Sequence, residues 1–316
     1  MNKNYALIGA AGYIAPRHMK AIKETGGVLT IAYDLNDSVG IMDSHFPDAA
    51  FFTEFEQFET EVYARQSRGE QIDYVGICSP NYLHKAHMSF ALRSGADAIC
   101  EKPLVLEPSE LDQLIALEKE TGHRINSILQ LRLHPAIRAL KEKVANGPAD
   151  RMYDVDLGYF TSRGSWYHAS WKGDIGKSGG IATNIGVHFY DMLSFVFGPI
   201  KSSVVHHRAA DASAGYLEFQ QARVRWVLSI NRTHLPAHTP DGQTTHRSIT
   251  IDGEEIEFSG GFTDLHTASY QGVLDGEGFG LEVVRPSIEL VSDIRNAPLE
   301  PQKGEQHPDL RKVIGA

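Results

Sequence analysis

The first 125 residues alternate short apolar runs with amphipathic segments, and this alternation restricts the fold more than any other feature. The apolar runs begin at residues 5, 28, 72, 96 and 124. Each stays apolar instead of alternating with polar residues, which is typical of strands that are buried on both faces. Segments with helical spacing separate the runs. The pattern predicts a doubly wound parallel sheet with helices on both faces, an α/β fold.

The pattern changes after residue 130. A helix is expected over 134–147, and longer segments at 152–160, 215–235 and 246–260 show period-two alternation, with Asp252-Gly253 as a hairpin turn. Residues 278–296 predict a helix that Pro286 interrupts. We therefore predict an N-terminal domain over 1–125. A C-terminal α+β domain over 126–316 would carry a large, open, mainly antiparallel sheet.

Bulk composition excludes several classes of protein. A formal charge of -10 argues against a nucleic-acid partner. Two cysteines, Cys78 and Cys100, give no disulfide framework, and no apolar run approaches the ~20 residues of a membrane span. Charged residues follow directly on the short apolar N-terminus, which disfavours a secretion signal. We expect a soluble, cytoplasmic protein with no membrane partner.

A glycine turn follows the first apolar run, in the order Gly9-x-x-Gly12-x-x-Ala15. Such a strand–turn–helix can hold a pyrophosphate at the helix N-terminus, although a tight turn without a ligand would use the same residues. Asp34 ends the second run, where a carboxylate accepts hydrogen bonds from a ribose diol and repels a 2′-phosphate. Together they predict a Rossmann domain that binds NAD in preference to NADP. Tyr13 and Ile14 belong to the same loop.

The third strand ends in Ser79-Pro80-Asn81, which we expect to border the same crevice. His84 and His87 follow at a spacing that a metal site could use, but no carboxylate or cysteine is obviously placed to complete one. We interpret them as residues of the helix surface or of the cofactor edge, with His84 a cofactor contact. No metal is expected.

The segment that ends in Glu101-Lys102-Pro103, with the glycine loop, resembles the glucose-fructose oxidoreductase/inositol dehydrogenase (Gfo/Idh/MocA) family almost end to end. That resemblance implies NAD- or NADP-dependent oxidation of a sugar or polyol hydroxyl. It also implies a catalytic Lys102, often before a cis proline, and cofactor contacts for Glu101 and Lys102. A lysine at the carboxyl end of a parallel strand lies where ligands bind and could accept a proton there, although an exposed lysine after a strand is the simpler reading of the tripeptide alone.

A second motif follows Gly179-Gly180, where Asn184, His188 and Asp191 are spaced to share one helix face. The resemblance places His188 beside the substrate hydroxyl. The family it resembles has Asp more often at the position of Asn184. An asparagine can orient an imidazole but supplies no negative charge. The division of labour between Lys102 and His188 therefore stays open, and a structural His188 bonded to Asp191 is the alternative.

Residues 160–180 and the N-terminal loop resemble a narrower group, the UDP-N-acetyl-2-amino-2-deoxyglucuronate 3-dehydrogenases of bacterial surface-polysaccharide (lipopolysaccharide) synthesis. A substrate with a carboxylate and a diphosphate suits a set of basic, aromatic and amide side chains. The candidate substrate contacts, with Asn184 and His188, are Gln130, Arg132, Arg163, Trp166, Tyr167, Trp171 and Lys172. Core or subunit packing is the other role open to the aromatic residues.

The resemblance also implies a homotetramer, a downstream aminotransferase and, in some relatives, 2-oxoglutarate as the reoxidant of NADH. We expect an apolar outer face on the second sheet to serve oligomerisation. Two alternatives remain: another NAD(P)-dependent sugar or inositol dehydrogenase of the family, and a non-catalytic NAD-sensing regulator, which could lose the lysine and histidine that this chain keeps.

Overall fold

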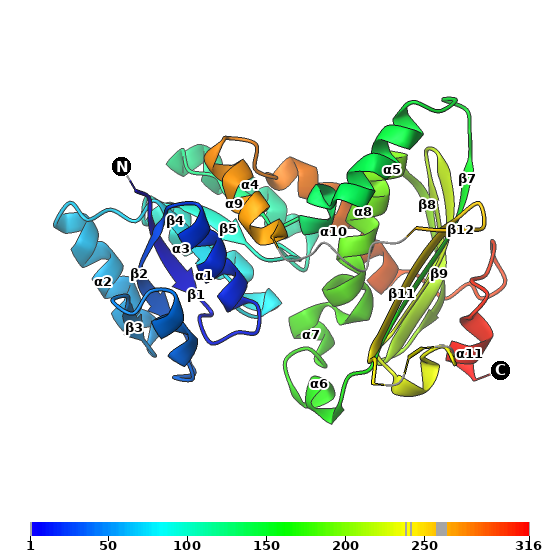
Figure 1. The fold of residues 1–316 in the computed structure, drawn as a ribbon, viewed down its shortest axis with the longest axis horizontal. Coiled ribbons are helices and arrows are strands. Elements are labelled where there is room, and N and C mark those ends of the chain that lie inside the picture. The colour runs from blue at the N-terminus through cyan, green and yellow to red at the C-terminus, as the bar shows by residue number, and fades with distance from the viewer. Residues whose placement is uncertain (1, 238, 241, 257–263, 316) are drawn as a thin grey trace. The chain divides into compact units, whose positions relative to one another are not determined.

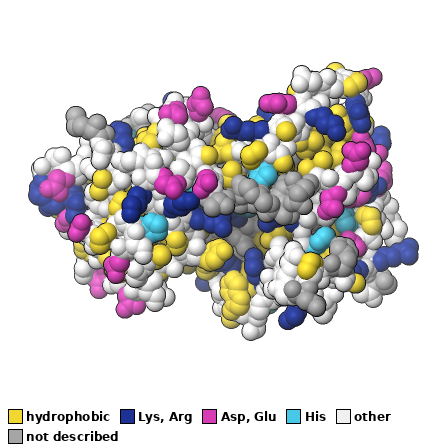
Figure 2. Space-filling model, in the orientation of Figure 1, with side chains coloured by type: hydrophobic (Ala, Val, Ile, Leu, Met, Phe, Trp, Pro, Cys, Tyr) yellow, Lys and Arg dark blue, Asp and Glu magenta, His cyan; other side chains and the backbone are white. Residues whose placement is uncertain are grey.

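The computed structural model describes residues 2–237, 239–240, 242–256 and 264–315 (Figure 1). The chain forms two compact units, one of residues 1–130 with 263–285 and one of residues 131–262 with 286–316. On the face seen in Figure 2, acidic and basic side chains are interspersed over each unit. Among the described helices, none has both the length and the apolarity to cross a membrane.

The first unit is built on a parallel sheet with the strand order β3-β2-β1-β4-β5-β6, which confirms the predicted Rossmann fold. Tyr5 to Ile8 are fully buried, as the unbroken apolar run predicts. The strands are β1 (Asn4–Ile8), β2 (Val28–Tyr33), β3 (Ala50–Phe52), β4 (Tyr74–Ile77), β5 (Asp97–Cys100) and β6 (Ile125–Ser127). The helices between them are α1 (Ala15–Glu24), α2 (Phe55–Ser67), α3 (His84–Arg93) and α4 (Pro108–Thr121).

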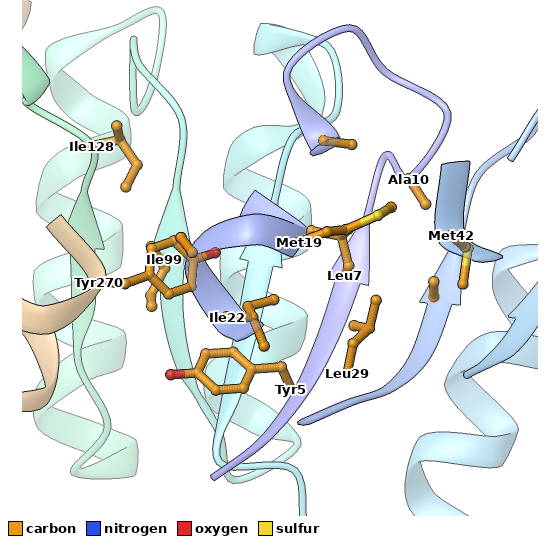
Figure 3. Close-up of a cluster of buried hydrophobic side chains, with 13 residues drawn as sticks. Tyr5, Leu7, Ala10, Met19, Ile22, Leu29, Met42, Ile99, Ile128 and Tyr270 are labelled. Atoms are coloured by element: carbon orange, nitrogen blue, oxygen red, sulfur yellow. The ribbon is translucent and has the colours of Figure 1, made fainter. Parts of the chain in front are cut away.

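A helix from much later in the chain completes the core of the first unit. α9 (Leu265–Leu274) packs against α1 and was not among the predicted elements. Its Tyr270 is fully buried, with its ring centroid 5.9 Å from that of Tyr5. Figure 3 shows Tyr270 among side chains from the sheet and from α1, including Ile99 and Ile22. The core of this unit therefore depends on residues from both ends of the chain.

The second unit contains a mixed sheet in the order β12-β11-β7-β10-β9-β8, in which only the β7–β10 pair is parallel among the described strands. This confirms the predicted mainly antiparallel sheet. The strands are β7 (Tyr153–Thr161), β8 (Ile200–Arg208), β9 (Ala212–Phe219), β10 (Ala222–Ser229), β11 (Thr245–Ile251) and β12 (Glu254–Glu255). The helices are α5 (Pro135–Ala145), α6 (Ser165–Ala169), α7 (Ile175–Ser178), α8 (Val187–Phe197) and α11 (Leu310–Ile314).

The hairpin predicted at Asp252-Gly253 is present. Ile251 pairs with Glu254, and both turn residues have positive φ, 52° and 85°, as a two-residue primed turn requires. Residues 257–260 of the strand expected there lie outside the described residues.

The two faces of the second sheet are covered differently. On one face, α8 packs its aromatic rings on the strands, with Tyr190 against Trp226 and Phe197 against Tyr153. The other face is crossed by the end of the chain, where Glu305 binds Arg225 and α11 packs beside Phe160. The predicted apolar outer face is present only in part, because the face also carries charged pairs and α11 covers its apolar part. Its use in oligomerisation stays a prediction.

The expected interruption at Pro286 is also absent, since α10 (Leu281–Asn296) runs through it. Pro286 is the sixth residue of α10, so the helix gives up only the hydrogen bond that its N–H would make to the carbonyl of Glu282. The division between the two units falls within α10, after Arg285.

The packing of α11 can be tested with Leu310, which is 3% exposed in a cluster with Phe160, Ala214 and Val227. We expect Leu310→Ala to lower the free energy of unfolding by about 2–5 kcal/mol, because it leaves a cavity against the sheet. Ile314→Ala, on the same helix but 45% exposed, should change it by about 0.5 kcal/mol or less. Urea denaturation measures both, and equal effects would contradict this packing.

Candidate active site

The glycine loop is fixed by a close backbone approach. Gly9 has φ of +89°, and a Cβ there would lie 2.7 Å from the carbonyl carbon of Cys78 and the amide nitrogen of Ser79. A Cβ on Gly12 would lie 3.0 Å from the carbonyl oxygen of Gly9. The loop thus lies directly against the end of β4. The glycines are needed for space as well as for conformation.

Asp34 holds the same loop from the end of β2. Its carboxylate accepts hydrogen bonds from the backbone N–H of Ala11, at 2.9 Å, and of Asn36, at 2.9 Å. A shallow depression of about 500 Å³ lies next to it, lined by Leu35, Asn36, Asp37 and Thr53. None of these four residues was a candidate from the sequence, although three of them directly follow Asp34. The depression is placed where the adenosine end of a dinucleotide held by Asp34 would lie.

Helix α1 begins at Ala15, directly after Ile14 of the loop, and Pro16 lies in its first turn. Within the described residues no side chain caps this helix start, where Ile14 is the N-cap. The backbone N–H groups of its first turn are therefore not taken up by a side-chain cap, and they suit the binding of an anion. Tyr13, in the loop, is 90% exposed. These features fit the pyrophosphate of NAD.

The residues after β4 are interior and tightly bonded. The Ser79 hydroxyl lies 2.8 Å from Nδ1 of His87, and His84 lies 2.8 Å through Nε2 from the Ser79 carbonyl oxygen. His84 Nδ1 also lies 2.7 Å from the carbonyl oxygen of Pro103. The helix-surface interpretation of His84 and His87 was therefore wrong: both are buried. Burial lowers the pKa of His87 to about 4.

Lys102 follows β5 and precedes a cis peptide bond to Pro103, as the family resemblance implies. The side chain of Glu101, just before it, is buried and accepts hydrogen bonds from His18 and His266, at 3.1 and 2.9 Å. Burial would raise the pKa of Glu101, but these two bonds outweigh it and hold the pKa well below its usual range. Neither histidine was a candidate site residue from the sequence.

In the second unit, Asn184 and Tyr167 come together. The Asn184 amide donates to the Tyr167 hydroxyl at 3.0 Å. Residues Ala182–Gly186 form a π-helical turn before α8, so the regular helical spacing expected for Asn184 and His188 does not apply there. Such turns are frequent at functional sites. Tyr167 is buried, whereas the neighbouring Trp166 is 54% exposed.

Asp191 has a partner that the sequence did not suggest. Both of its oxygens accept from Arg132, at 2.8 and 2.7 Å, in a buried bidentate pair. Burial raises the pKa of Asp191, and Arg132 opposes that rise. The same guanidinium lies 5.1 Å from the centroid of the Phe195 ring. The pair gives Arg132 a structural role besides the predicted substrate contact.

Two cations lie near each other on the same unit. Burial, with the charge of Arg163, lowers the pKa of Lys172, and the Lys172 ammonium lies 4.1 Å from the Trp171 ring centroid. In the part of the chain that the structure describes, neither Arg163 nor Lys172 forms an ion pair with a carboxylate. Adjacent cations of this kind suit an anionic ligand.

The fold and the first unit's site define a dinucleotide-binding protein of the Rossmann class joined to an α+β domain. Residues 3–128 match the model of the oxidoreductase family's NAD-binding Rossmann fold, and residues 141–238 match that of its C-terminal α/β domain. The chain belongs to this Gfo/Idh/MocA oxidoreductase family and binds NAD.

Among solved structures, the chain is similar to the WlbA (WbpB) dehydrogenase from Thermus thermophilus in complex with NAD and UDP-GlcNAcA. The two are 50% identical, with a TM-score of 0.93 over 98% of this chain and 100% of that one. The same dehydrogenase was also solved with NAD and alpha-ketoglutarate. The WlbA dehydrogenase from Bordetella pertussis shares the fold, with a TM-score of 0.76 over 95% of this chain and 98% of that one at 20% identity.

Curated relatives are more distant. They include a 1,5-anhydro-D-fructose reductase from Ensifer adhaerens, 24% identical over 79% of this chain and 77% of the relative. A putative oxidoreductase, YteT, from Bacillus subtilis matches at 24% over 48% of this chain, and the match covers only 36% of YteT.

The close approach at Gly9 gives a direct test. We expect Gly9→Ala to weaken NAD binding strongly and to destabilise the chain, because the added Cβ meets the backbone of Cys78. The matched control is Gly26→Ala, where φ is also positive (+76°) but nothing lies within 4 Å. We expect Gly26→Ala to lower the free energy of unfolding by about 1–2 kcal/mol and to leave the NAD dissociation constant nearly unchanged. Fluorescence titration with NAD and urea denaturation separate the two effects, and equal losses in both variants would refute the crowding argument.

Proposed function

We propose that this chain oxidises the 3-hydroxyl of UDP-N-acetyl-2-amino-2-deoxyglucuronate to the 3-keto sugar nucleotide, with NAD as the hydride acceptor. The observation that carries the proposal is the 50% identity, over 98% of the chain, to a dehydrogenase solved with NAD and UDP-GlcNAcA. Family membership supports an oxidoreductase activity independently. We further propose that the first unit holds the cofactor and the second the sugar nucleotide.

In the proposed reaction the hydroxyl proton passes to a basic side chain while C3 loses a hydride, which gives a ketone, NADH and a proton. NAD supplies the electrophilic nicotinamide carbon that takes the hydride. Lys102 and His188 are the two candidates for the base. Lys102 follows β5 at the carboxyl end of the parallel sheet, where ligands of this fold bind. Asn184, bonded to Tyr167, would orient the sugar or His188.

The negative charges of the substrate have candidate partners in the second unit. We propose that Arg163 and Lys172 bind the carboxylate or the diphosphate. The support is their mutual proximity together with the absence of a carboxylate partner in the described part of the chain. Trp171, which lies under Lys172, and the exposed Trp166 offer flat apolar surfaces for a sugar or a uracil ring.

Several finer features of the proposal rest on resemblance. We propose a cytoplasmic homotetramer that acts in lipopolysaccharide synthesis and passes its ketone to an aminotransferase. The neighbour solved with alpha-ketoglutarate supports 2-oxoglutarate as a reoxidant that would return bound NADH to NAD. A ketone beside a C2 acetamido group is the product class that an aminotransferase consumes.

The role of Lys102 is tested by Lys102→Ala. We expect a loss of about 10²–10⁴ in kcat, the range that a positioned acid–base group contributes, with NAD affinity within a few-fold of wild type. Lys119→Ala, on the exposed face of α4, is the matched control and should leave turnover unchanged. NADH absorbance with the UDP-sugar, with and without 2-oxoglutarate, measures kcat. Equal loss of NAD binding and turnover would mean that Lys102 serves the cofactor. A wild-type chain that forms no ketone from any UDP-sugar would refute the proposed activity.

Lys172 gives a pH prediction. A lysine is charged below its pKa, and the pKa of Lys172 is lowered by burial and by Arg163. Its positive charge is therefore lost at a lower pH than that of an ordinary lysine. We expect KM for the UDP-sugar to rise on the alkaline side, and Lys172→Arg to move that rise to higher pH because a guanidinium stays charged. An alkaline limb identical in both proteins would exclude Lys172 from anion binding.

A further inference from the structure

The first unit contains a buried polar cluster that the proposed chemistry does not use. His18 comes from α1, Glu101 from the end of β5 and His266 from α9, and their side-chain ligand atoms lie within 4.8 Å of one another. His18 and His266 are 0% and 3% exposed. Tyr270, one turn after His266, joins the cluster through a 2.8 Å bond from its hydroxyl to Nδ1 of His18.

One arrangement of protons satisfies every bond in this cluster. Tyr270 donates to Nδ1 of His18, and both histidines donate through Nε2 to Oε1 of Glu101. His18, which accepts through Nδ1 and donates through Nε2, is then neutral, and the carboxylate is ionised. Burial lowers the pKa of His18, in keeping with the neutral form. The second oxygen of Glu101, Oε2, lies 3.3 Å from the backbone nitrogen of Lys102 and accepts from it.

The carboxylate is therefore shared between the two histidines on one oxygen and the Lys102 backbone on the other. A glutamine could not replace it, because its single amide oxygen cannot accept on both sides. His18 lies on α1, the helix that follows the glycine loop. His266 lies on α9, much later in the chain. Glu101 thus connects α1, the Lys102 segment and α9.

We propose that His18 and His266 position Lys102 by holding Glu101 as an ionised acceptor for the Lys102 backbone. The three residues are a positioning group, and the inference rests on the proposed role of Lys102. A transition metal bound by the same three side chains is the competing arrangement. The direct bonds from both imidazoles to one oxygen favour the hydrogen-bonded arrangement.

Asparagine and glutamine place their amide nitrogens at different distances from the backbone, and this difference makes a specific test. Both bonds to Glu101 use Nε2, and the amide nitrogen of glutamine reaches about where Nε2 of histidine lies, whereas that of asparagine lies nearer to Nδ1. We expect His266→Asn to lower kcat by about tenfold or more, with little change in KM, and His266→Gln to recover most of that loss. Thr267→Ala, next to His266 on the exposed side of α9, is the control and should behave as wild type.

A second measurement does not depend on turnover. The rate of reductive methylation of Lys102 in the purified protein, read by mass spectrometry against Lys119 in the same sample, reports the setting of the Lys102 side chain. We expect it to change several-fold in His266→Asn and in Glu101→Gln but not in His266→Gln. Glu101→Gln keeps the shape of the side chain, so it still decides the matter if His266→Asn fails to fold.

The outcomes are distinct. If His266→Gln is as impaired as His266→Asn in both measurements, or if neither variant alters Lys102 labelling, the positioning role is wrong. Stoichiometric zinc or another metal in the purified chain, lost in His266→Asn, would also overturn it in favour of a metal site. If wild type does not oxidise the UDP-sugar but the labelling pattern holds, the proposed function fails and the positioning of Lys102 stands.

Discussion

The approach of the glycine loop to the end of β4 is the constraint on which the cofactor half depends. Gly9 lies so close to the backbone of Cys78 and Ser79 that a side chain there would force the turn after β1 away from the end of β4. Asp34 then closes the loop from the other side by accepting the N–H of Ala11. The same carboxylate that is expected to bind the ribose thus also shapes the phosphate loop. That Gly9-x-x-Gly12 serves as a variant of the dinucleotide fingerprint stays a prediction.

The sequence predicted those parts of the fold that follow from local pattern. Unbroken apolar runs identified the parallel strands, and because their carboxyl ends share one edge, Gly9, Asp34 and Lys102 could be assigned to one region. α9 could not be placed in this way. Its sequence is compatible with a helix, but no local pattern predicts that Tyr270 fills a core whose other buried members all lie between Tyr5 and Ile128. His266 was missed for the same reason. The cover of the second sheet's outer face could not be predicted either, because the end of the chain is equally remote in sequence.

The candidate substrate half shows a different limit. The helical spacing drawn through Asn184, His188 and Asp191 assumed a regular α-helix, but Ala182–Gly186 form a π-helical turn. That turn changes which side chains share a face, and the Asn184 amide reaches Tyr167. Asp191 is bound by Arg132, a residue chosen from the sequence for a different reason. The spacing therefore did not identify the hydrogen-bond partners of Asn184 and Asp191. The roles of these residues in substrate binding stay predictions.

A buried carboxylate explains why the returning helix matters to the cofactor half. Removing an ionised carboxylate from water is costly unless hydrogen bonds replace the lost hydration. For Glu101 the two imidazole donors come from α1 and α9, so an ionised Glu101 requires that both helices be in place. Packing of Tyr270 in the apolar core and its bond to His18 bring α9 to that position. The apolar core and the buried charge thus specify the same arrangement. A shift of α9 that left His266 out of reach would leave a buried anion with one donor fewer, which makes the alternative packing unfavourable.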